Sequence, residues 1–298
     1  MHSRQNRALR AAGGLVADEP LWLRCLLIGA SFAIVGGLIL VPLIYVFVQA
    51  LGPGLHTYLD NLWRDPDTRH SIWMTLTVAP IAVLLNTVLG IAAAWTVTRF
   101  RFPGRTLIVT LLDVPFAVSP VVVGLMFVLL FGMQGYFGPA LREWGIKIIF
   151  AWPGLVLATT FVTLPFVARE LIPLMEALGA DEELAAVSLG ANPWQLFWRV
   201  TLPNIKWGLA YGIIQCNARA IGEFGAVYVV SGRIDGETYT MPLRVDKLFQ
   251  EYNMPASYAV ASMLTLMAVA TLGIKLLLER YIAAQIELDD QKQLESQS

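Results

Sequence analysis

Long apolar stretches dominate the pattern of hydrophobic and polar positions along the chain. Five uncharged runs are long enough to cross a membrane as helices, at 25–55, 71–98, 114–141, 148–168 and 252–274. A hydrocarbon core about 30 Å thick is crossed by ~20 helical residues, so each run is predicted to span the bilayer. A sixth run, 207–232, is interrupted only by two charged residues. The pattern therefore predicts an all-α integral membrane protein with six transmembrane helices.

The composition supports this picture. Of the 298 residues, 56% are hydrophobic and only 14% are charged, a balance that a soluble domain could not keep in solution. No linker or repeat separates the spans, so residues 21–282 are predicted to form one transmembrane domain. Polar tails flank it at 1–20 and 283–298, and the second tail is expected to be solvated and frayed.

The distribution of Lys and Arg predicts the orientation of the chain. Six spans place both termini on the same side of the membrane. Segments on that side carry 13 basic residues, against 7 in the segments on the other side. Cytoplasmic loops of membrane proteins carry the excess of basic residues. Both termini and the loop at about 173–206 are therefore predicted to be cytoplasmic.

Proline residues interrupt several spans, most strongly between Asp113 and Pro120, where Pro115 and Pro120 lie close together. Backbone groups freed by such breaks must be satisfied by neighbouring helices or by a water-lined cavity. We therefore expect the third span to be kinked or split at this place. Proline kinks that only help the helices to pack explain the pattern equally well.

The cytoplasmic loop is predicted to contain two short helices joined by a tight turn. A cap and an acidic first turn favour a helix over 182–189, which a glycine ends. An asparagine cap and a proline at the first helical position begin a second helix, 193–200, which a further proline ends. The cap, turn and stop positions are Asp181, Gly190, Asn192, Pro193 and Pro203.

This helix-turn-helix is predicted to dock onto a protein rather than onto DNA. Its only basic residue before Lys206 is Arg199, whereas binding a phosphate backbone needs a cluster of basic side chains. Trp194, Phe197 and Trp198 are candidate anchors for a hydrophobic groove on a partner. A structured loop without a docking role is the remaining alternative.

Ionisable residues inside a span are candidates for function, because each costs roughly 2.5–3.5 kcal/mol at the centre of a bilayer. Arg219 and Glu223 are four residues apart, so they are expected to share a helix face and to pair. Such a pair could neutralise itself in the bundle interior. Alternatively, it lines a permeation path in which Arg219 offers a positive charge to an anion and Glu223 holds it in position.

Asp113 and Ser119, beside the predicted break in the third span, are further candidates for the permeation path. Asp113 could instead cap the broken helix. A bare carboxylate that lines an anion route is unfavourable unless it is paired.

The sequence contains few signs of catalysis or of a bound cofactor. A phosphate-binding loop needs the dipeptide Gly-Lys, which does not occur, and there is no Gly-x-Ser-x-Gly elbow of a hydrolase. The histidines His2, His56 and His70 lie in a tail or in one external loop, so no metal site is predicted within the spans. An intramembrane enzyme built on the charges within the spans is a distant alternative, and it would stay active without ATP.

The loop resembles the cytoplasmic loop of ABC importer permeases. That loop has a Glu-Ala-Ala triplet, a Gly four residues after its last Ala and, ten residues beyond the Gly, an aliphatic residue followed by x-Leu-Pro. The matching residues here are Ala185, Ala186, Gly190, Val200, Leu202 and Pro203. Leu184 stands where the family has Glu, with Glu183 directly before it.

The resemblance implies that this loop couples the membrane part to an ATPase. The residues expected to take part are Glu183, Ala185, Ala186, Gly190, Trp194, Phe197 and Pro203. Because the expected Glu is replaced by Leu184, the main coupling role is assigned to the Gly190 turn and to the apolar faces of the two helices.

Further stretches resemble the W-type permease subunits of sulfate/thiosulfate ABC importers. They lie at 99–105, 112–121, 165–171 and 217–226, and the resemblance covers residues 25–280. It implies a type I importer permease fold for the domain at 21–282. It also implies transport of sulfate or thiosulfate across the bacterial inner membrane by alternating access. A molybdate or tungstate permease of the same fold is the nearer alternative.

The resemblance also implies partners. A homologous second permease subunit would complete the pathway, and a periplasmic sulfate- or thiosulfate-binding protein would deliver the anion. Two copies of a cytoplasmic ATPase would bind ATP and receive the docking loops. The chain itself would contact membrane lipid, would bind no cofactor and no nucleic acid, and would not be an enzyme.

Overall fold

The computed structural model describes residues 21–297, with side chains for 22–281, so the predicted tail at 1–20 lies outside the described residues. All regular structure in the described residues is helical, as predicted. The helices are α2 (Leu21–Leu51), α3 (Leu55–Trp63), α4 (Pro66–Arg99), α5 (Arg105–Ala117), α6 (Pro120–Phe131), α7 (Gly138–Glu143), α8 (Trp152–Leu178), α9 (Asp181–Ser188), α10 (Pro193–Leu196), the π-helical turn η1 (Phe197–Thr201), α11 (Leu202–Ile221), α12 (Gly225–Val230), α13 (Met241–Gln250) and α14 (Met254–Gln297).

Within the described part of the chain, four helices are long and apolar enough to cross a membrane, namely α2, α4, α8 and α14. The pair α5 and α6 forms a fifth candidate span when the two are taken together. The sixth predicted span, 207–232, falls on α11 and α12, which are separated by residues 222–224. The multi-pass architecture therefore agrees with the prediction, while the count of six spans stays a prediction.

The third span is broken where the sequence predicts a break. α5 ends at Ala117, α6 begins at Pro120, and the two helices are bent by 108°. A proline at the start of a helix loses no hydrogen bond, and Ser119 before it has the extended backbone that prolines impose on their predecessors. The predicted limits, 114–141, are wrong, because the apolar pattern runs through the bend and beyond the end of α6.

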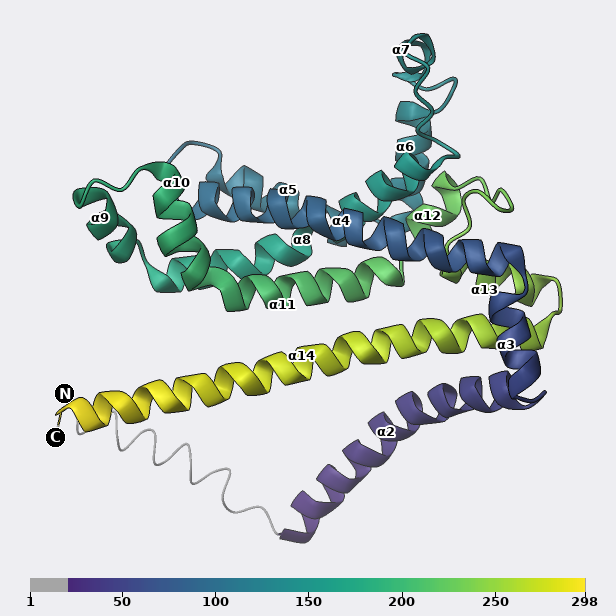
Figure 1. Cartoon of the computed structure of the whole chain (residues 1–298), viewed down its shortest axis with the longest axis horizontal. Coiled ribbons are helices and arrows are strands. Elements are labelled where there is room, and N and C mark those ends of the chain that lie inside the picture. The colour runs from purple at the N-terminus through teal and green to yellow at the C-terminus, as the bar shows by residue number, and fades with distance from the viewer. Residues whose placement is uncertain (1–20, 298) are drawn as a thin grey trace.

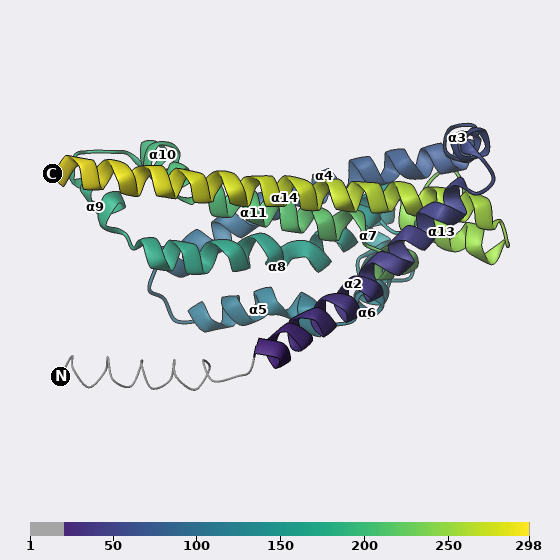
Figure 2. The same ribbon diagram turned by 90° about the horizontal axis from the view of Figure 1, so that it is seen from below.

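Helices α4, α8 and α11 pack against one another at the centre of the molecule (Figure 1). Figure 2 shows α14, α11, α8 and α5 in that order across the molecule, and packing contacts join each to the next. α2 packs mainly on α14, also contacts α3, and exposes large apolar side chains such as Phe32 and Leu38. An exposed hydrophobic surface of this kind suits lipid or a second membrane subunit.

Helix α14 extends further than expected. It continues to Gln297, so the backbone of the predicted frayed tail at 283–298 is helical over almost its whole length. No proline or glycine follows Gly273 to end the helix, and most residues in this part of the chain are good helix formers.

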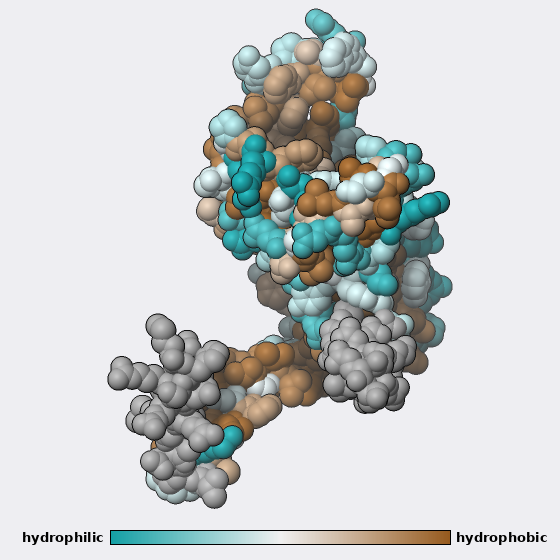
Figure 3. Space-filling view, turned by 90° about the vertical axis from the view of Figure 1, so that its left-hand side faces the viewer, coloured by the Kyte–Doolittle hydropathy of each residue, from teal (hydrophilic) through white to brown (hydrophobic). Residues whose placement is uncertain are grey.

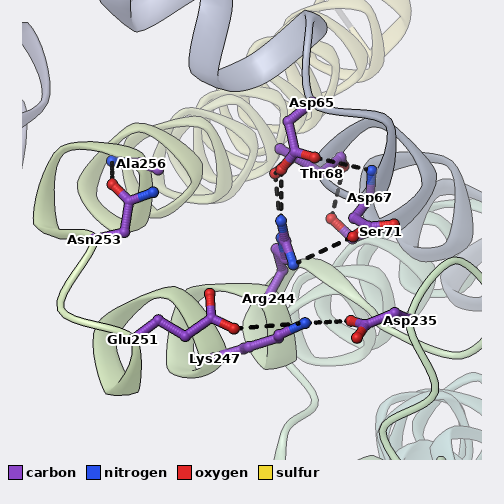
Figure 4. Close-up of polar contacts among 10 residues, drawn as sticks. All are labelled: Asp65, Asp67, Thr68, Ser71, Asp235, Arg244, Lys247, Glu251, Asn253 and Ala256. Carbon is purple, nitrogen blue, oxygen red and sulfur yellow. Dashed lines mark hydrogen bonds and ion pairs between the residues drawn. The ribbon is translucent and has the colours of Figure 1, made fainter.

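An ion-pair cluster joins α13 to the start of α4, at the end of the molecule that is predicted to be external (Figure 4). Arg244 is 5% exposed, and its Nη2 lies 2.5 Å from Asp65 Oδ2. Its Nε donates to Thr68 Oγ1 at 3.2 Å. The Asp65 carboxylate also caps α4, because it accepts hydrogen bonds from the Asp67 N–H and the Thr68 hydroxyl.

Protonation of Asp65 is expected to weaken this cluster. Partial burial raises the pKa of the Asp65 carboxyl, but the Thr68 hydrogen bond and the Arg244 guanidinium outweigh burial and hold the pKa below its ordinary value of 3.8. A carboxylate with a lowered folded-state pKa stabilises the fold above its unfolded-state pKa. That contribution is lost as the pH falls through the folded-state pKa.

We expect Asp65→Asn to lower the unfolding temperature of the purified protein at neutral pH. The difference from the wild type should shrink below about pH 4 and vanish as the wild-type carboxylate is protonated too. Asp246→Asn is the control and should follow the wild type, because the Asp246 carboxylate on α13 accepts a hydrogen bond from Gln250 of the same helix and is not paired with Arg244. An Asp65→Asn protein as stable as the wild type at neutral pH would contradict the expectation.

Candidate coupling surface and translocation path

The first helix of the cytoplasmic loop, α9, begins one residue earlier than predicted. Asp181 is its first helical residue, and Ala180 occupies the cap position without a side-chain hydrogen bond, so the predicted capping by Asp181 is wrong. The acidic first turn suits the positive end of the helix dipole. Gly190 then reverses the chain with a φ of +86°, a conformation that residues with a side chain rarely adopt.

The second helix starts as predicted but does not end at Pro203. Asn192 accepts a hydrogen bond from the Gln195 N–H at 2.8 Å, and the Gln195 side chain accepts one from the Asn192 N–H at 3.1 Å. This capping box fixes the start of α10. The helix then continues through η1 into α11. A π turn widens the backbone, which offers a way around the clash of a proline ring with the carbonyl four residues earlier.

A largely buried ion pair ties α9 to the end of α4. Arg99 Nε lies 2.7 Å from Glu183 Oε2 and Arg99 Nη2 lies 3.2 Å from Oε1, and the two side chains are only 13% and 12% exposed. Arg99 Nη1 also donates to the Met175 carbonyl of α8 at 3.1 Å. The Thr201 hydroxyl of η1 donates to Glu183 Oε1 at 2.9 Å. We call these four residues the Glu183 clasp.

The clasp gives Glu183 partners that the sequence analysis missed. Arg99 lies 84 positions away in the chain and Thr201 lies 18 positions away. Leu184, at the position where the family has Glu, is 62% exposed. The carboxylate one position earlier therefore points inward and ties α9 to α4 and η1.

Of the three aromatic residues predicted to be anchors, two lie on the surface and one does not. Trp194 is 71% exposed and Trp198 is 50% exposed. Phe197 is half-buried and stacks on Trp95 of α4, with ring centroids 5.3 Å apart. Part of the Phe197 ring is therefore packed inside this subunit, and its entry into a groove of the partner stays a prediction.

A shallow hollow of about 300 Å³ lies between α9 and the second helix. It is lined by Ala186, Leu189, Gly190, Ala191, Gln195, Arg199 and Val200. The other predicted coupling residues Ala185 and Pro203 are exposed. Figure 3 views this end of the molecule and shows hydrophobic and hydrophilic surfaces side by side. Such a mixed, partly concave surface is suited to binding a protein.

The break in the third span meets a second break, between α11 and α12. A Cβ placed on Gly225 would lie 2.9 Å from Pro120 Cβ, and one on Gly124 would lie 2.7 Å from the Ala226 carbonyl oxygen. The two glycines thus let the helices after each break pack backbone to backbone. Irregular backbone at membrane depth is tolerated only where it is enclosed by protein or lines an aqueous cavity.

Arg219 and Glu223 pair across the second break. Arg219 Nη1 lies 2.5 Å from Glu223 Oε2, so the predicted pairing is present. The two do not share a helix face, because α11 ends at Ile221 and Glu223 lies in the break. Glu223 Oε1 accepts a hydrogen bond from the Ala226 N–H at 3.0 Å. Glu223 is 1% exposed and Arg219 is 35% exposed, so the cation alone reaches the surface.

Asp113 is paired with Arg169, which the sequence analysis did not name as a site residue. Arg169 Nε lies 2.8 Å from Asp113 Oδ1, and the side chains are 58% and 42% exposed. The guanidinium also lies over the ring of Phe116, 4.8 Å from its centroid. The suggestion that Asp113 caps the broken helix is therefore wrong. Ser119 is exposed at the break and makes no side-chain cap.

These groups can hold and guide an anion, but they do not form a metal centre. No cluster of three or more metal-binding side chains occurs among the residues the structure describes. The two half-exposed arginines, Arg169 and Arg219, each carry a carboxylate partner that fixes the guanidinium in place.

Known proteins are similar to this chain in sequence and in fold. The family described as "Binding-protein-dependent transport system inner membrane component" matches residues 86–283. The chain is 54% identical to the sulfate transport system permease protein CysW of Escherichia coli (strain K12), over 87% of this chain and 88% of that protein. It is 36% identical to the sulfate transport system permease protein CysT of the same organism, over 80% of this chain and 85% of that one.

A solved structure confirms the predicted fold class. A bacterial ABC transporter involved in the import of the acidic polysaccharide alginate superposes with a TM-score of 0.69 at 19% identity, over 88% of this chain and 98% of that one. The matched family region contains the helix-turn-helix loop, both breaks and the ion pairs of Arg219 with Glu223 and of Arg169 with Asp113. The chain therefore belongs to the inner membrane components of binding-protein-dependent transport systems, and within them to the sulfate permeases of the W type.

Proposed function

We propose that the chain is the translocation subunit of an ATP-driven importer that moves sulfate and thiosulfate into the bacterial cell. The observation that carries the proposal is the 54% identity to a sulfate permease over 87% of the chain. Its relatives are transport permeases, so the chain is a transport subunit rather than an intramembrane enzyme. A strongly hydrated dianion cannot cross hydrocarbon unaided, so its transport requires a polar path through protein.

Three kinds of partner complete this transporter. A homologous second permease forms the other half of the path. The similarity of this chain to both the CysW and the CysT sulfate permeases supports this pairing. Two copies of a cytoplasmic ATPase bind ATP and receive the α9–α10 loops. A periplasmic binding protein delivers the anion. The exposed apolar surface of α2 meets lipid or the second permease.

The proposal includes an orientation. Both termini and the α9–α10 loop face the cytoplasm, because the excess of basic residues lies in these segments. The Arg244 cluster on α13 then faces the periplasm, since α13 lies at the opposite end of the molecule from α9 (Figure 1).

The Glu183 clasp supplies a mechanism for coupling. When ATP closes the ATPase dimer, the α9–α10 loop moves with the ATPase. The clasp passes that movement from α9 to α4 and α8, because Arg99 holds Glu183 and the Met175 carbonyl at once. α10, η1 and α11 form one continuous helix, which transmits the same movement to the break between α11 and α12. The membrane helices then shift together, and the translocation path opens toward the periplasm.

The translocation path needs only a weak electrostatic attraction for the anion. Arg219 presents a fixed positive charge near the second break, and the buried Glu223 carboxylate holds it there. Asp113 and Ser119 mark the first break, where Arg169 offers a second cation. Tight recognition is left to the binding protein, because a path that bound sulfate tightly would release it slowly.

The substrate is tested by uptake of labelled sulfate in cells that lack other sulfate importers and express the complete transporter. Unlabelled thiosulfate should compete with sulfate for uptake. Molybdate and tungstate should compete poorly. Strong competition by molybdate, with little sulfate uptake, would favour a molybdate permease of the same fold and overturn the proposed substrate.

Replacing Gly190 by tryptophan is expected to reduce uptake at least about tenfold while ATP hydrolysis continues, a loss that corresponds to ~1.4 kcal/mol of docking free energy. No atom lies within 4 Å of a Cβ placed on Gly190, so the indole would project from the loop and obstruct docking. Gly190→Ala carries the same backbone strain without the bulk and should lose much less. Uptake at the wild-type rate in Gly190→Trp, measured with ATP hydrolysis in proteoliposomes, would contradict a docking role.

A further inference from the structure

A small enclosed cavity lies beside the second break, between α4, α8 and the start of α13. The space open to the centre of a water molecule is about 10 Å³. Aliphatic side chains that include Val78 and Val227 form part of its wall. The polar part of the wall consists of Thr75, Thr159, Thr240 and Glu223.

Three polar atoms of this wall lack a hydrogen-bond partner within the described residues. They are Thr159 Oγ1, Thr240 Oγ1 and Glu223 Oε2. The three residues are 1%, 5% and 2% exposed, so bulk water does not reach them. Thr75 differs, because its hydroxyl donates to the Ser71 carbonyl and accepts from the Met241 N–H.

Glu223 Oε2 is close to Arg219 Nη1, at 2.5 Å, but this contact is not directed as a hydrogen bond. The carboxylate oxygen therefore still has room for a donor. A buried polar group without a partner costs about 1–3 kcal/mol. Two hydroxyls without a partner and one carboxylate oxygen that can accept a further hydrogen bond point to a bound molecule that satisfies them together.

We propose that the cavity binds one ordered water molecule, which accepts hydrogen bonds from the Thr159 and Thr240 hydroxyls and donates one to Glu223 Oε2. A single buried water needs ~10–15 Å³ of such space and two to four polar partners, and the cavity offers both. A water can accept two hydrogen bonds and donate one here, which matches two hydroxyl donors and one carboxylate acceptor.

The size and charge of the cavity exclude other occupants. An oxyanion of sulfur or molybdenum is far larger than one water, and a carboxylate would repel it. A sodium ion is small enough, but Arg219 already neutralises Glu223, so a second cation would meet a positive charge. The site is independent of which anion the permease carries.

The water joins three elements that are far apart in the chain. Thr159 lies on α8, Thr240 directly precedes α13, and Glu223 lies between α11 and α12. Thr159 and Thr240 are thus positioning residues for Glu223, which in turn holds Arg219. A water bridge of this kind can reform after small helix shifts more easily than a direct side-chain contact.

The experiment is X-ray radiolytic footprinting of the complete transporter in lipid nanodiscs. Bound water generates hydroxyl radicals that oxidise the side chains beside it. Val227 and Val78 line the cavity although they are only 1% and 3% exposed. Val230, on the same helix as Val227 and 0% exposed, packs away from the cavity and is the matched control.

We expect Val227 and Val78 to be oxidised severalfold faster than Val230 in the wild-type protein. The double variant Thr159→Val with Thr240→Val should bring Val227 down to the rate of Val230, whereas Thr159→Ser, which keeps the hydroxyl, should not. Wild-type Val227 oxidised no faster than Val230 would overturn the proposal, even if the double variant does not fold. A rise in unfolding temperature specific to sodium over potassium would overturn it in favour of a cation site.

Discussion

Replacing Glu183 by alanine is expected to abolish sulfate uptake while the ATPase continues to hydrolyse ATP. The change removes both hydrogen bonds of the carboxylate to Arg99 and leaves a guanidinium that is only 13% exposed without its counter-charge. Removing one partner of a buried pair costs about 3–5 kcal/mol, and the partial exposure of this pair places the cost near the lower end. The link between α9 and α4 is lost with it.

The matched control is Glu176→Ala at the same end of the molecule. Glu176 pairs with Arg105 at 2.5 Å, but these side chains are 49% and 45% exposed. An exposed pair contributes about 0–1 kcal/mol, so uptake should stay near the wild-type level. A more direct test is the exchange of the two clasp charges, Arg99→Glu with Glu183→Arg, which should recover part of the uptake.

The comparison of uptake with ATP hydrolysis, in proteoliposomes that contain the whole transporter, decides whether the clasp acts in coupling. If Glu183→Ala transports sulfate at the wild-type rate, the clasp has no part in coupling. If instead both activities fall together because the transporter no longer assembles, the charge exchange must restore both; no recovery would likewise count against the clasp.

Replacing Arg219 alone by alanine is expected to remove most of the folded protein from the membrane. The Glu223 carboxylate is 1% exposed and would stay at the break without a cation. The expected cost is about 3–5 kcal/mol, a large fraction of the stability of a typical domain. Arg169→Ala is the stability control, because its partner Asp113 is 42% exposed and can be solvated. Membrane abundance and the unfolding temperature in detergent measure the difference.

The double variant Arg219→Ala with Glu223→Ala separates structure from transport. Removing both charges leaves no buried charge without a partner, so the protein should return to the membrane at close to normal abundance. We expect its sulfate uptake to stay low, because the half-exposed cation beside the path is gone. If the double variant transports sulfate normally, the pair serves only packing and Arg219 is not part of the path.

The local features of the docking loop and of the breaks could be read from sequence. The Asn192 cap, the Gly190 turn and the break before Pro120 depend on backbone preferences of one residue and its immediate neighbours. Pairing of Arg219 with Glu223 depends on a spacing of four residues. That pairing is present even though the helix ends between the two residues, since the chain has little room to separate them.

Predictions from single residues were wrong for two helix boundaries in the cytoplasmic loop. Asp181 was expected to cap α9 and instead forms its first turn. Pro203 was expected to end a helix that in fact continues through a π turn into α11. In both cases the side chain has the right chemistry for a boundary. The helix that continues past Pro203 packs on α4 and α8 as α11.

The sequence by itself thus determined that the protein is a helical, multi-pass membrane protein with a helix-turn-helix loop, because hydrophobic run length and turn residues act over short distances. Only the tertiary structure decided which charged residues form ion pairs. Arg99 pairs with Glu183, 84 positions away in the chain, and Arg169 pairs with Asp113, 56 positions away. Many charges are chemically suitable partners, and the packing of the helices selects among them. The largely buried Arg99 must pair with the charge that packing brings nearest, because both charges are removed from water. The more exposed Arg169 and Asp113 meet because α8 packs against α5.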